Sequence, residues 1–462
     1  MNKKTSSIRL PFHFDRAMLP MIFSLAWPPT MLEQFMQTAV QYIDTAMVGS
    51  LGTHATAAVG STGTVNWLIE STISAIGIGF LYYISQSIGA GKILQAKKAA
   101  GQAVFSTVLV GIFFTLLTCS CSHLVPVWMR VDPSIRDMAA RYFLILYSPM
   151  LFRTMNIILG TVLRSAGDAK SPMIAGITMN VINIVLNFFL IYNTRSVHLG
   201  NWLLTVPGAG WGIEGAAIAS AIAYTCGGIL IAWKLWHHNT VSPKGQSLRP
   251  DPQILKPCLR VAFPNMLQRF ATSLGYVAFA SMINSLGELS TAAHTIANTV
   301  ESAFYIPGWG MQTAAATLSG NARGAQDEER LHRLSNTIIP MEISLMLVSG
   351  GMLFVFAPVL MGIFTQDPQV LSLGTTVLRM VAVSEPFYGV PIVLEGMMQG
   401  LGKTMIPFVF NIIGMWGVRI VGTFICTQLL GLGLIAAWGC MIAHNLLLFV
   451  LYIALFSSGK WK

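Results

Sequence analysis

The sequence is poor in charged residues and in the motifs of soluble enzymes. Asp, Glu, Lys and Arg make up 10% of the 462 residues, whereas a soluble domain has about 25%. The six cysteines show no metal-binding spacing, and we interpret Cys119 and Cys121, inside an apolar run, as small hydrophobic residues. We find no Ser–His–Asp arrangement, phosphate loop or metal-ligand set, and we expect no cleavable signal in residues 1–16. These absences argue against an enzyme.

Long apolar runs are what the sequence has instead. Apolar residues make up 54% of the chain, and the mean hydropathy is +0.63. A helix needs about 20 residues to cross a bilayer. Runs of this length lack the alternation of barrel strands and predict an all-α integral membrane protein with twelve transmembrane helices. The predicted spans are residues 18–50, 57–83, 94–120, 138–163, 171–193, 213–236, 255–284, 290–318, 332–363, 373–400, 405–428 and 432–457.

Basic residues are concentrated on alternate connections between these spans. Twenty lie on one predicted side of the membrane: Lys3, Lys4, Arg9, Arg16, Lys92, Lys97, Lys98, Arg164, Lys170, Lys234, Lys244, Arg249, Lys256, Arg260, Arg323, Arg330, Arg333, Lys403, Lys460 and Lys462. Four lie on the other: Arg130, Arg136, Arg141 and Arg195. The positive-inside rule places the first side, with both termini, in the cytoplasm. We therefore predict a multi-pass protein of the cytoplasmic (inner) membrane, and topology explains the net charge of +10 better than nucleic-acid binding does.

An internal repeat divides the chain into two halves. The matched segments are PPTMLEQF from Pro28 and FPNMLQRF from Phe263, SLG at 50–52 and 285–287, Gly89-Ala90 and Gly324-Ala325, and Gly167 and Gly402, each pair 235 residues apart. Six spans per half give both halves the same orientation, so the repeats are parallel. We predict two six-helix lobes around a central cleft: an N-terminal lobe (1–236), a cytoplasmic linker (237–254) and a C-terminal lobe (255–462).

The first span carries a polar stripe that includes two carboxylates. Gln34, Gln37, Gln41 and Asp44 follow +3 and +4 steps and share one helix face, with Glu33 beside it. An ionised acid near the bilayer centre costs about 2.5–3.5 kcal/mol, so we expect the stripe to face the bundle interior or a wet cavity. In the repeat, Phe279 is the equivalent of Asp44 and Gln268 is the equivalent of Glu33, so neither acid has an acidic counterpart. That difference favours function for Asp44 over a structural role locked to a neighbouring helix.

Other polar residues reach the depth of Asp44 in the outer half of the first lobe. They are Asn180, Asn183 and Asn187 in span 5, Ser220 in span 6, and Tyr142 and Tyr147 in span 4. We expect these side chains to converge around one carboxylate. The asparagines also suit hydrogen bonds between helices, and the tyrosines also suit anchors at the membrane interface.

A second polar set lies nearer the predicted midplane. Its members are Glu70, Arg269, Glu301, Glu385 and Arg419. An unpaired Arg at this depth is costly, so we expect Arg269 to pair with Glu301 or Glu385. A structural ion pair is the favoured interpretation of this set.

Two adjacent prolines, Pro28 and Pro29, lie inside the first span. Proline removes a backbone hydrogen bond and frees a neighbouring carbonyl, so this is a place where the helix can bend. Pro264 occupies the matching position of the second half, so the prolines can equally serve only to shape the helix.

Several segments resemble a known transporter family. YIDTAMVGSLG in span 1, LRSAGDAKSPM after span 4, NIVLN in span 5 and AAHTIANTVESAFYIPGWGMQTAAATLSGNARGA across span 8 resemble the multidrug and toxic compound extrusion (MATE) family. The similarity covers essentially all twelve spans. It implies two lobes forming a V-shaped cleft, and export of cationic or amphipathic compounds against inward H⁺ or Na⁺.

The resemblance also assigns expected roles to residues. Asp44 matches the family's cation-responsive acid of the first helix, Asn183 a polar position of span 5 and Ser220 a hydroxyl position of span 6. One branch has an Asp where this chain has Asn187. Another branch has a cation site in the second lobe, and its two acids correspond to Thr272 and Tyr388 here, so the resemblance does not extend to that site.

The leading hypothesis is a proton-coupled drug antiporter in which Asp44 takes up the proton. We expect no cofactor other than the coupling ion, a monomeric protein, membrane lipid as surroundings, and small organic cations or amphipathic drugs as substrates. Na⁺ coupling is the close rival, because a carboxylate with amide and hydroxyl oxygens suits a hard cation and would make Asp44 a metal ligand. A flippase for lipid-linked precursors is the alternative from another class. Such proteins commonly have extra spans or a basic cleft, for which only Arg269 and Arg419 are candidates.

Overall fold

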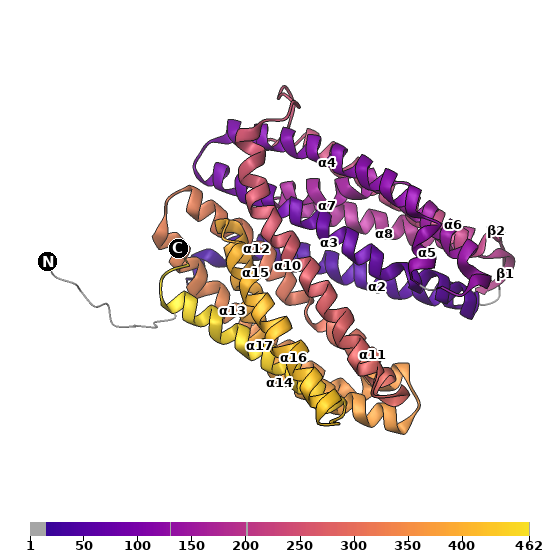
Figure 1. Cartoon of the computed structure of the whole chain (residues 1–462). Helices are drawn as coiled ribbons and strands as arrows, with labels where there is room; N and C mark the ends of the chain where they lie inside the picture. Colours follow the sequence, from indigo (N-terminus) through magenta and orange to yellow (C-terminus); the bar gives the residue numbers. More distant parts are fainter. Residues whose placement is uncertain (1–14, 130, 200–201, 462) are drawn as a thin grey trace. The chain divides into compact units, whose positions relative to one another are not determined.

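Helices form almost all of the described chain. The computed structural model describes residues 15–129, 131–199 and 202–461 (Figure 1). The predicted orientation partly rests on Lys3, Lys4, Arg9, Arg130 and Lys462, which lie outside these residues. Within the described part, eight helices are long and apolar enough to cross a membrane, and the bent pair formed by α6 and α7, with 48° between its members, makes a ninth. The count of twelve spans stays a prediction.

The described chain forms two compact units, and α3 and α10 each contribute residues to both. The first comprises residues 32–84 and 92–259. Its elements are α2 (Met31–Gly49), most of α3 (Thr53–Gly89), α4 (Ile93–Cys121), α5 (Leu124–Trp128), η3 (Pro133–Ile135), α6 (Arg136–Tyr147), α7 (Met150–Ser165), α8 (Lys170–Leu190), β1 (Asn193–Leu199), β2 (Trp202–Ala209) and α9 (Gly212–Trp236). Helix α8 packs along α9, and α7 packs against both α4 and α9.

The second unit comprises, among the described residues, 15–31, 85–91 and 260–461. Its elements are η1 (Arg16–Met18), α1 (Leu19–Leu25), η2 (Ala26–Thr30), α10 (Pro252–Asn284), α11 (Glu288–Phe304), α12 (Ile306–Gly324), α13 (Glu328–Phe364), α14 (Pro368–Leu401), α15 (Met405–Ile412), η4 (Ile413–Ile420), α16 (Val421–Phe424), η5 (Ile425–Leu429) and α17 (Leu434–Ser457). These units begin and end at other residues than the predicted lobes, whose boundaries stay a prediction.

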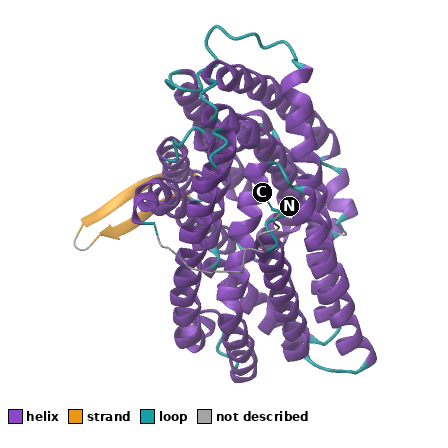
Figure 2. Ribbon diagram, turned by 90° about the vertical axis from the view of Figure 1, so that its left-hand side faces the viewer, coloured by secondary structure: helices purple, strands orange, loops and turns teal. Residues whose placement is uncertain are grey.

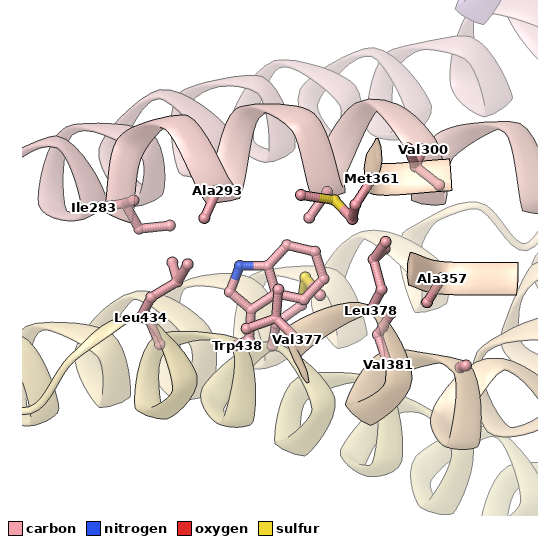
Figure 3. Packing of buried hydrophobic residues seen from close by; sticks show 14 of the residues in the cluster. Ile283, Ala293, Val300, Ala357, Met361, Val377, Leu378, Val381, Leu434 and Trp438 are labelled. Carbon is pink, nitrogen blue, oxygen red and sulfur yellow. The ribbon is translucent and has the colours of Figure 1, made fainter. Parts of the chain in front are cut away.

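The core of the second unit is organised around Trp438. Figure 3 shows its indole ring between helices, next to Val377 and Leu378, and all three side chains are fully buried. The indole nitrogen donates to His294 Nδ1 at 3.2 Å, which satisfies the one polar atom of this large apolar group. This packing joins α11, α14 and α17.

One element was not predicted from the sequence. Strands β1 and β2 form an antiparallel hairpin (Figure 2), where the predicted structure is the end of span 5 and a loop. The all-α prediction is therefore right for the described residues except at this hairpin. Its sequence mixes β-branched and polar residues without a long apolar run, so a search for spans passes over it.

The first predicted span is not one continuous α-helix. Between α1 and α2 the backbone forms one turn of π-helix, η2, with Pro29 inside it. The Thr30 hydroxyl donates to the Leu25 carbonyl at 2.6 Å and so satisfies a carbonyl near the proline. Pro264 lies within α10, which is helical throughout. The two repeat-equivalent proline sites therefore differ in backbone structure.

The end of α3 crosses α12 at residues that are equivalent in the repeat. A Cβ added at Gly89 would lie 2.0 Å from the carbonyl oxygen of Asn321, and one added at Gly324 would lie 2.0 Å from that of Gln86. Gln86 and Asn321 are 235 residues apart, as are Gly89 and Gly324. The contact is thus reciprocal, and only glycine allows the backbones to approach this closely.

Candidate functional site

Asp44, in α2, is held by side chains from α8. Asn187 Nδ2 donates to Asp44 Oδ1 at 2.6 Å. The Asn183 amide lies between Asp44 and Ser220 of α9. In the orientation that satisfies both neighbours, its nitrogen lies 2.8 and 3.0 Å from the two carboxylate oxygens and its oxygen accepts from Ser220 Oγ at 2.9 Å. The structure therefore brings four predicted site residues together through hydrogen bonds that connect three helices.

Asn183 and Asn187 are four residues apart on α8, so their side chains share one face of the helix. Asn183 and Asn187 are buried, while Asp44 is partly exposed. Charge-assisted hydrogen bonds to a carboxylate are roughly twice as strong as neutral ones. The oxygen Oδ1 of Asn187 is buried and has no hydrogen-bond partner within the described residues. The site thus combines one acid, two amide donors and one spare acceptor.

The remaining predicted members of this set divide between two places. Tyr142 is buried in α6 and close enough to Asp44 to interact with it electrostatically. Tyr147, also in α6, donates instead to Asn66 Oδ1 at 2.8 Å. Asn180 lies one turn before Asn183 on α8 and is buried, but no hydrogen bond connects it to Asp44 within the described residues.

A buried arginine of the same unit was missed. Arg153, in α7, is 3% exposed, and its Nη2 lies 2.6 Å from Glu70 Oε1 of α3. Its guanidinium also stacks over the ring of Tyr224, 4.6 Å from the centroid. The missed signal was an arginine near the middle of the predicted span 138–163, because an arginine at that depth in a membrane needs a partner. Glu70 therefore pairs within the first unit, and its predicted place in a set with residues of the second half is not confirmed.

Glu33, at the other end of α2, makes an ion pair in which one guanidinium nitrogen contacts both carboxylate oxygens. Arg164 Nη2, in α7, lies 2.7 and 2.6 Å from its two carboxylate oxygens. Gln34 is partly buried, whereas Gln37 and Gln41 are exposed. The structure therefore ties Glu33 to a neighbouring helix, and contact of this stripe with a transported compound stays a prediction.

The expected pairing of Arg269 is wrong. Arg269 Nε donates to Asn265 Oδ1 at 3.0 Å, and neither Glu301 nor Glu385 forms an ion pair with it among the described residues. The acid that acts on Arg269 electrostatically is Glu395, near the predicted cytoplasmic end of span 10. Depth estimated from residue counts was too coarse to identify the partner, because each helix end is uncertain by several residues.

The other midplane residues lie in separate surroundings. Glu301 accepts a hydrogen bond from Tyr305. The guanidinium of Arg419, in the π-helical segment η4, stacks over Phe279 at 4.1 Å and Tyr276 at 5.0 Å. Both carboxylate oxygens of Glu385 are buried without a hydrogen-bond partner in the described part of the chain. Arg419 forms no ion pair within the described residues, and cation–π contacts stabilise its buried charge instead.

Comparison with known proteins places these features in a family. The MatE family model matches residues 29–189 and 264–425, which are the two halves of the repeat. A probable multidrug resistance protein NorM of Thermotoga maritima is 26% identical over 434 residues, 94% of this chain and 91% of the relative. A probable multidrug resistance protein YoeA of Bacillus subtilis is 26% identical over 422 residues, 90% of this chain and 88% of the relative.

Solved structures share the fold. A MOP superfamily transporter from Pyrococcus furiosus superposes with a TM-score of 0.86 at 23% identity, over 96% of this chain and 95% of that one. The matched family model covers most of the chain, in both repeats and through the helices that carry Asp44, Asn183 and Asn187. The chain belongs to the MatE family, the multidrug and toxic compound extrusion transporters.

Proposed function

We propose that this chain is a cation-coupled multidrug efflux antiporter of the cytoplasmic membrane. It exports cationic or amphipathic organic compounds in exchange for H⁺, and Asp44 is the coupling carboxylate. The observation that carries the proposal is the Asp44 cluster, in which one acid of a membrane helix is bound by two asparagine amides. The names of the bacterial relatives, which are multidrug resistance proteins, support the substrate class.

Protonation of Asp44 changes which hydrogen bonds the cluster can make. An ionised carboxylate only accepts, and here it accepts from Asn187 and Asn183. A protonated carboxyl group also donates, so one oxygen must face an acceptor in place of an amide N–H. The unpartnered Oδ1 of Asn187 is that acceptor once the amide turns over. Proton uptake therefore rearranges the contact between α2 and α8.

The same charge provides the exchange. The ionised carboxylate attracts an organic cation, and the proton removes this attraction, so proton and substrate compete for one acid. Competition for one site couples two flows when each ligand favours a different arrangement of the helices. The π-helical turn η2, with Pro29, is a place where the first span can bend.

The test is efflux of a fluorescent organic cation by reconstituted protein under separate gradients. A pH gradient should drive efflux by the unaltered chain, and Asp44→Asn should abolish it while the protein still folds. Asp137→Asn is the matched control, because Asp137 is an exposed acid of the same unit and its loss should leave efflux unchanged. Normal pH-driven efflux by Asp44→Asn sinks the assignment.

Sodium coupling is favoured by one specific observation. The Asp44 oxygens and the unpartnered Asn187 Oδ1 are oxygen ligands of the type that Na⁺ takes. The same vesicles with a sodium gradient at equal pH separate the two ions. Efflux driven by sodium alone, and lost in Asp44→Asn, would keep Asp44 as the coupling residue and replace the proton.

A further inference from the structure

A pair of glutamates in the second unit plays no part in the Asp44 cluster. Glu342, in α13, and Glu385, in α14, are both 0% exposed. All four of their carboxylate oxygens are buried without a hydrogen-bond partner among the described residues. Helices α13 and α14 pack closely along their lengths. Glu342 is not a member of either polar set that was predicted from the sequence.

Space for the Glu342 carboxyl group is made by two glycines on different helices. A Cβ added at Gly389 of α14 would lie 2.8 Å from Glu342 Oε1, and one added at Gly308 of α12 would lie 3.0 Å from the same atom. Met346 and Ile392 fill the rest of this wall and are buried. The carboxyl group thus points between three helices into an apolar niche that any other residue at the two glycine positions would fill.

Glu385 lies against a third glycine. A Cβ added at Gly350 of α13 would lie 3.1 Å from Glu385 Cβ and 3.3 Å from its Cγ. Glu385 and Glu342 are close enough to interact electrostatically, and Glu301 acts on Glu385 as well. Two negative charges here, without a cation, would oppose each other in a dry environment.

The groups around this pair supply no counter-ion. Helix α11 contributes Glu301, which is bound to Tyr305, and α14 contributes Tyr388, whose ring lies 4.9 Å from that of Tyr305. The nearest part of α12 contributes Gly308. Helix α17 contributes His444, whose ring lies against Gly414 and not against the glutamates.

The charged groups nearest to the pair act elsewhere. Arg419 acts electrostatically on Glu301. The backbone N–H of Asp15, next to η1, donates to Thr337 Oγ1, more than a turn along α13 from Glu342. No Lys, Arg or His forms an ion pair with Glu342 or Glu385 in the described residues.

We propose that Glu342 and Glu385 form a second proton-binding site, in which both carboxyl groups carry a proton in this arrangement of α12, α13 and α14. The ligand is H⁺, since the described residues hold no group of three or more His, Cys, Asp or Glu side chains placed to bind a metal ion. When these helices separate enough to admit water, each O–H bond breaks, the proton passes to water and a carboxylate remains. This site is independent of the proposed role of Asp44, which belongs to the other unit.

The experiment is infrared spectroscopy of the full-length protein in lipid nanodiscs at neutral pH, which detects the C=O stretch of protonated carboxyl groups. The Asp44→Asn background removes any contribution from Asp44. In that background the band should be present. It should lose part of its intensity in Glu342→Gln and in Glu385→Gln, and more in the double variant.

Glu328→Gln is the matched control, because Glu328 is exposed on the same helix, α13. It should leave the band unchanged. The absence of the band in Asp44→Asn itself overturns the proposal without any substitution in the second unit, so the test survives misfolding of the glutamine variants. An unchanged band in a folded double variant overturns it too. Since no transport is measured, these outcomes are separate from failure of the Asp44 assignment.

Discussion

The amide nitrogen of Asn187 donates a hydrogen bond to Asp44, and the contribution of this bond to transport can be measured. Asn187→Leu removes a charge-assisted bond of 2.6 Å, which typically contributes about 1.5–3 kcal/mol. We expect pH-driven efflux to fall by about tenfold or more, since about 1.4 kcal/mol corresponds to one factor of ten. Thr178→Val on the same helix is the control, because its hydroxyl bonds only to its own helix, at Ile174 O. Equal efflux in both variants would contradict a role for Asn187.

Arg153 and Glu70 should stabilise the fold as a pair. Arg153→Met leaves Glu70 unpaired, and breaking a buried pair costs about 3–5 kcal/mol. Because Glu70 is 31% exposed, we expect a smaller loss. Glu70→Gln added to Arg153→Met should recover part of it. Thermal unfolding of the four proteins in detergent gives the coupling energy, and strictly additive effects would mean that the pair contributes nothing.

Spacing along one helix predicted which residues share a face, and chemistry predicted which of them need partners. Asp44, Asn183 and Asn187 were found in this way. The partners of Arg269 and Arg153 were not, since they depend on the rotation and depth of neighbouring helices. A shift of one residue turns a helix by 100°, so pairing across helices needs atomic positions.

The π-helical turn η2 is the element that we expect to respond to a small change. Thr30→Val keeps the side-chain shape and removes the hydroxyl that bonds to Leu25 O. Loss of this one hydrogen bond costs about 0.5–1.5 kcal/mol. We expect lower thermal stability and slower efflux together. Thr178→Val serves again as the control, and an unchanged melting temperature for Thr30→Val would show that the turn does not depend on this bond.

The polar connection after α9 should loosen in acid. Burial lowers the pKa of His238 below its usual value of 6.5, although nearby Asp168 acts in the opposite direction. The backbone N–H groups of Thr240 and Val241 donate to His238 Nδ1, which requires this nitrogen to be unprotonated. The unfolded segment therefore takes up a proton first as pH falls, so the stability that His238 contributes is present above about pH 6.5 and decreases below it.

Limited proteolysis of residues 237–251 across this pH range measures the effect. Cleavage should rise as pH falls in the unaltered chain. The rise should be smaller in His238→Gln, which cannot titrate. A pH dependence that is identical in both proteins would exclude His238 as its source.

At the scale of the whole molecule, the reciprocal crossing of α3 and α12 should tolerate no side chain. Gly89→Ala and Gly324→Ala each place a Cβ 2.0 Å from a backbone oxygen, and overpacking of this kind costs about 1–3 kcal/mol or more. The two losses should be similar because the positions are equivalent. Gly351→Ala is the control, since nothing lies within 4 Å of its added Cβ, and it should be neutral or stabilising by up to about 1 kcal/mol.

The helical fold and the duplication could be predicted from the sequence, because in each case one physical constraint acts on many residues at once. Hydrophobic length predicted helices, and the fixed offset of 235 residues predicted a duplicated chain. The hairpin β1–β2 and the junction at Met31 were not accessible. Both depend on local packing of short segments, for which no long-range pattern in the sequence exists.

The crossing of α3 and α12 also bears on how such a chain arose. Gln86 and Gly89 contact Asn321 and Gly324, so both helices contribute equivalent residues to the contact. This is the property of an isologous interface, in which one surface binds a copy of itself across a twofold axis. A half-length ancestor with a single copy of this glycine would have met its own twin through the same backbone contact. Fusion of such a homodimer would produce a chain of this kind, with two sides free to diverge, one carrying Asp44 and the other Phe279 at the equivalent position.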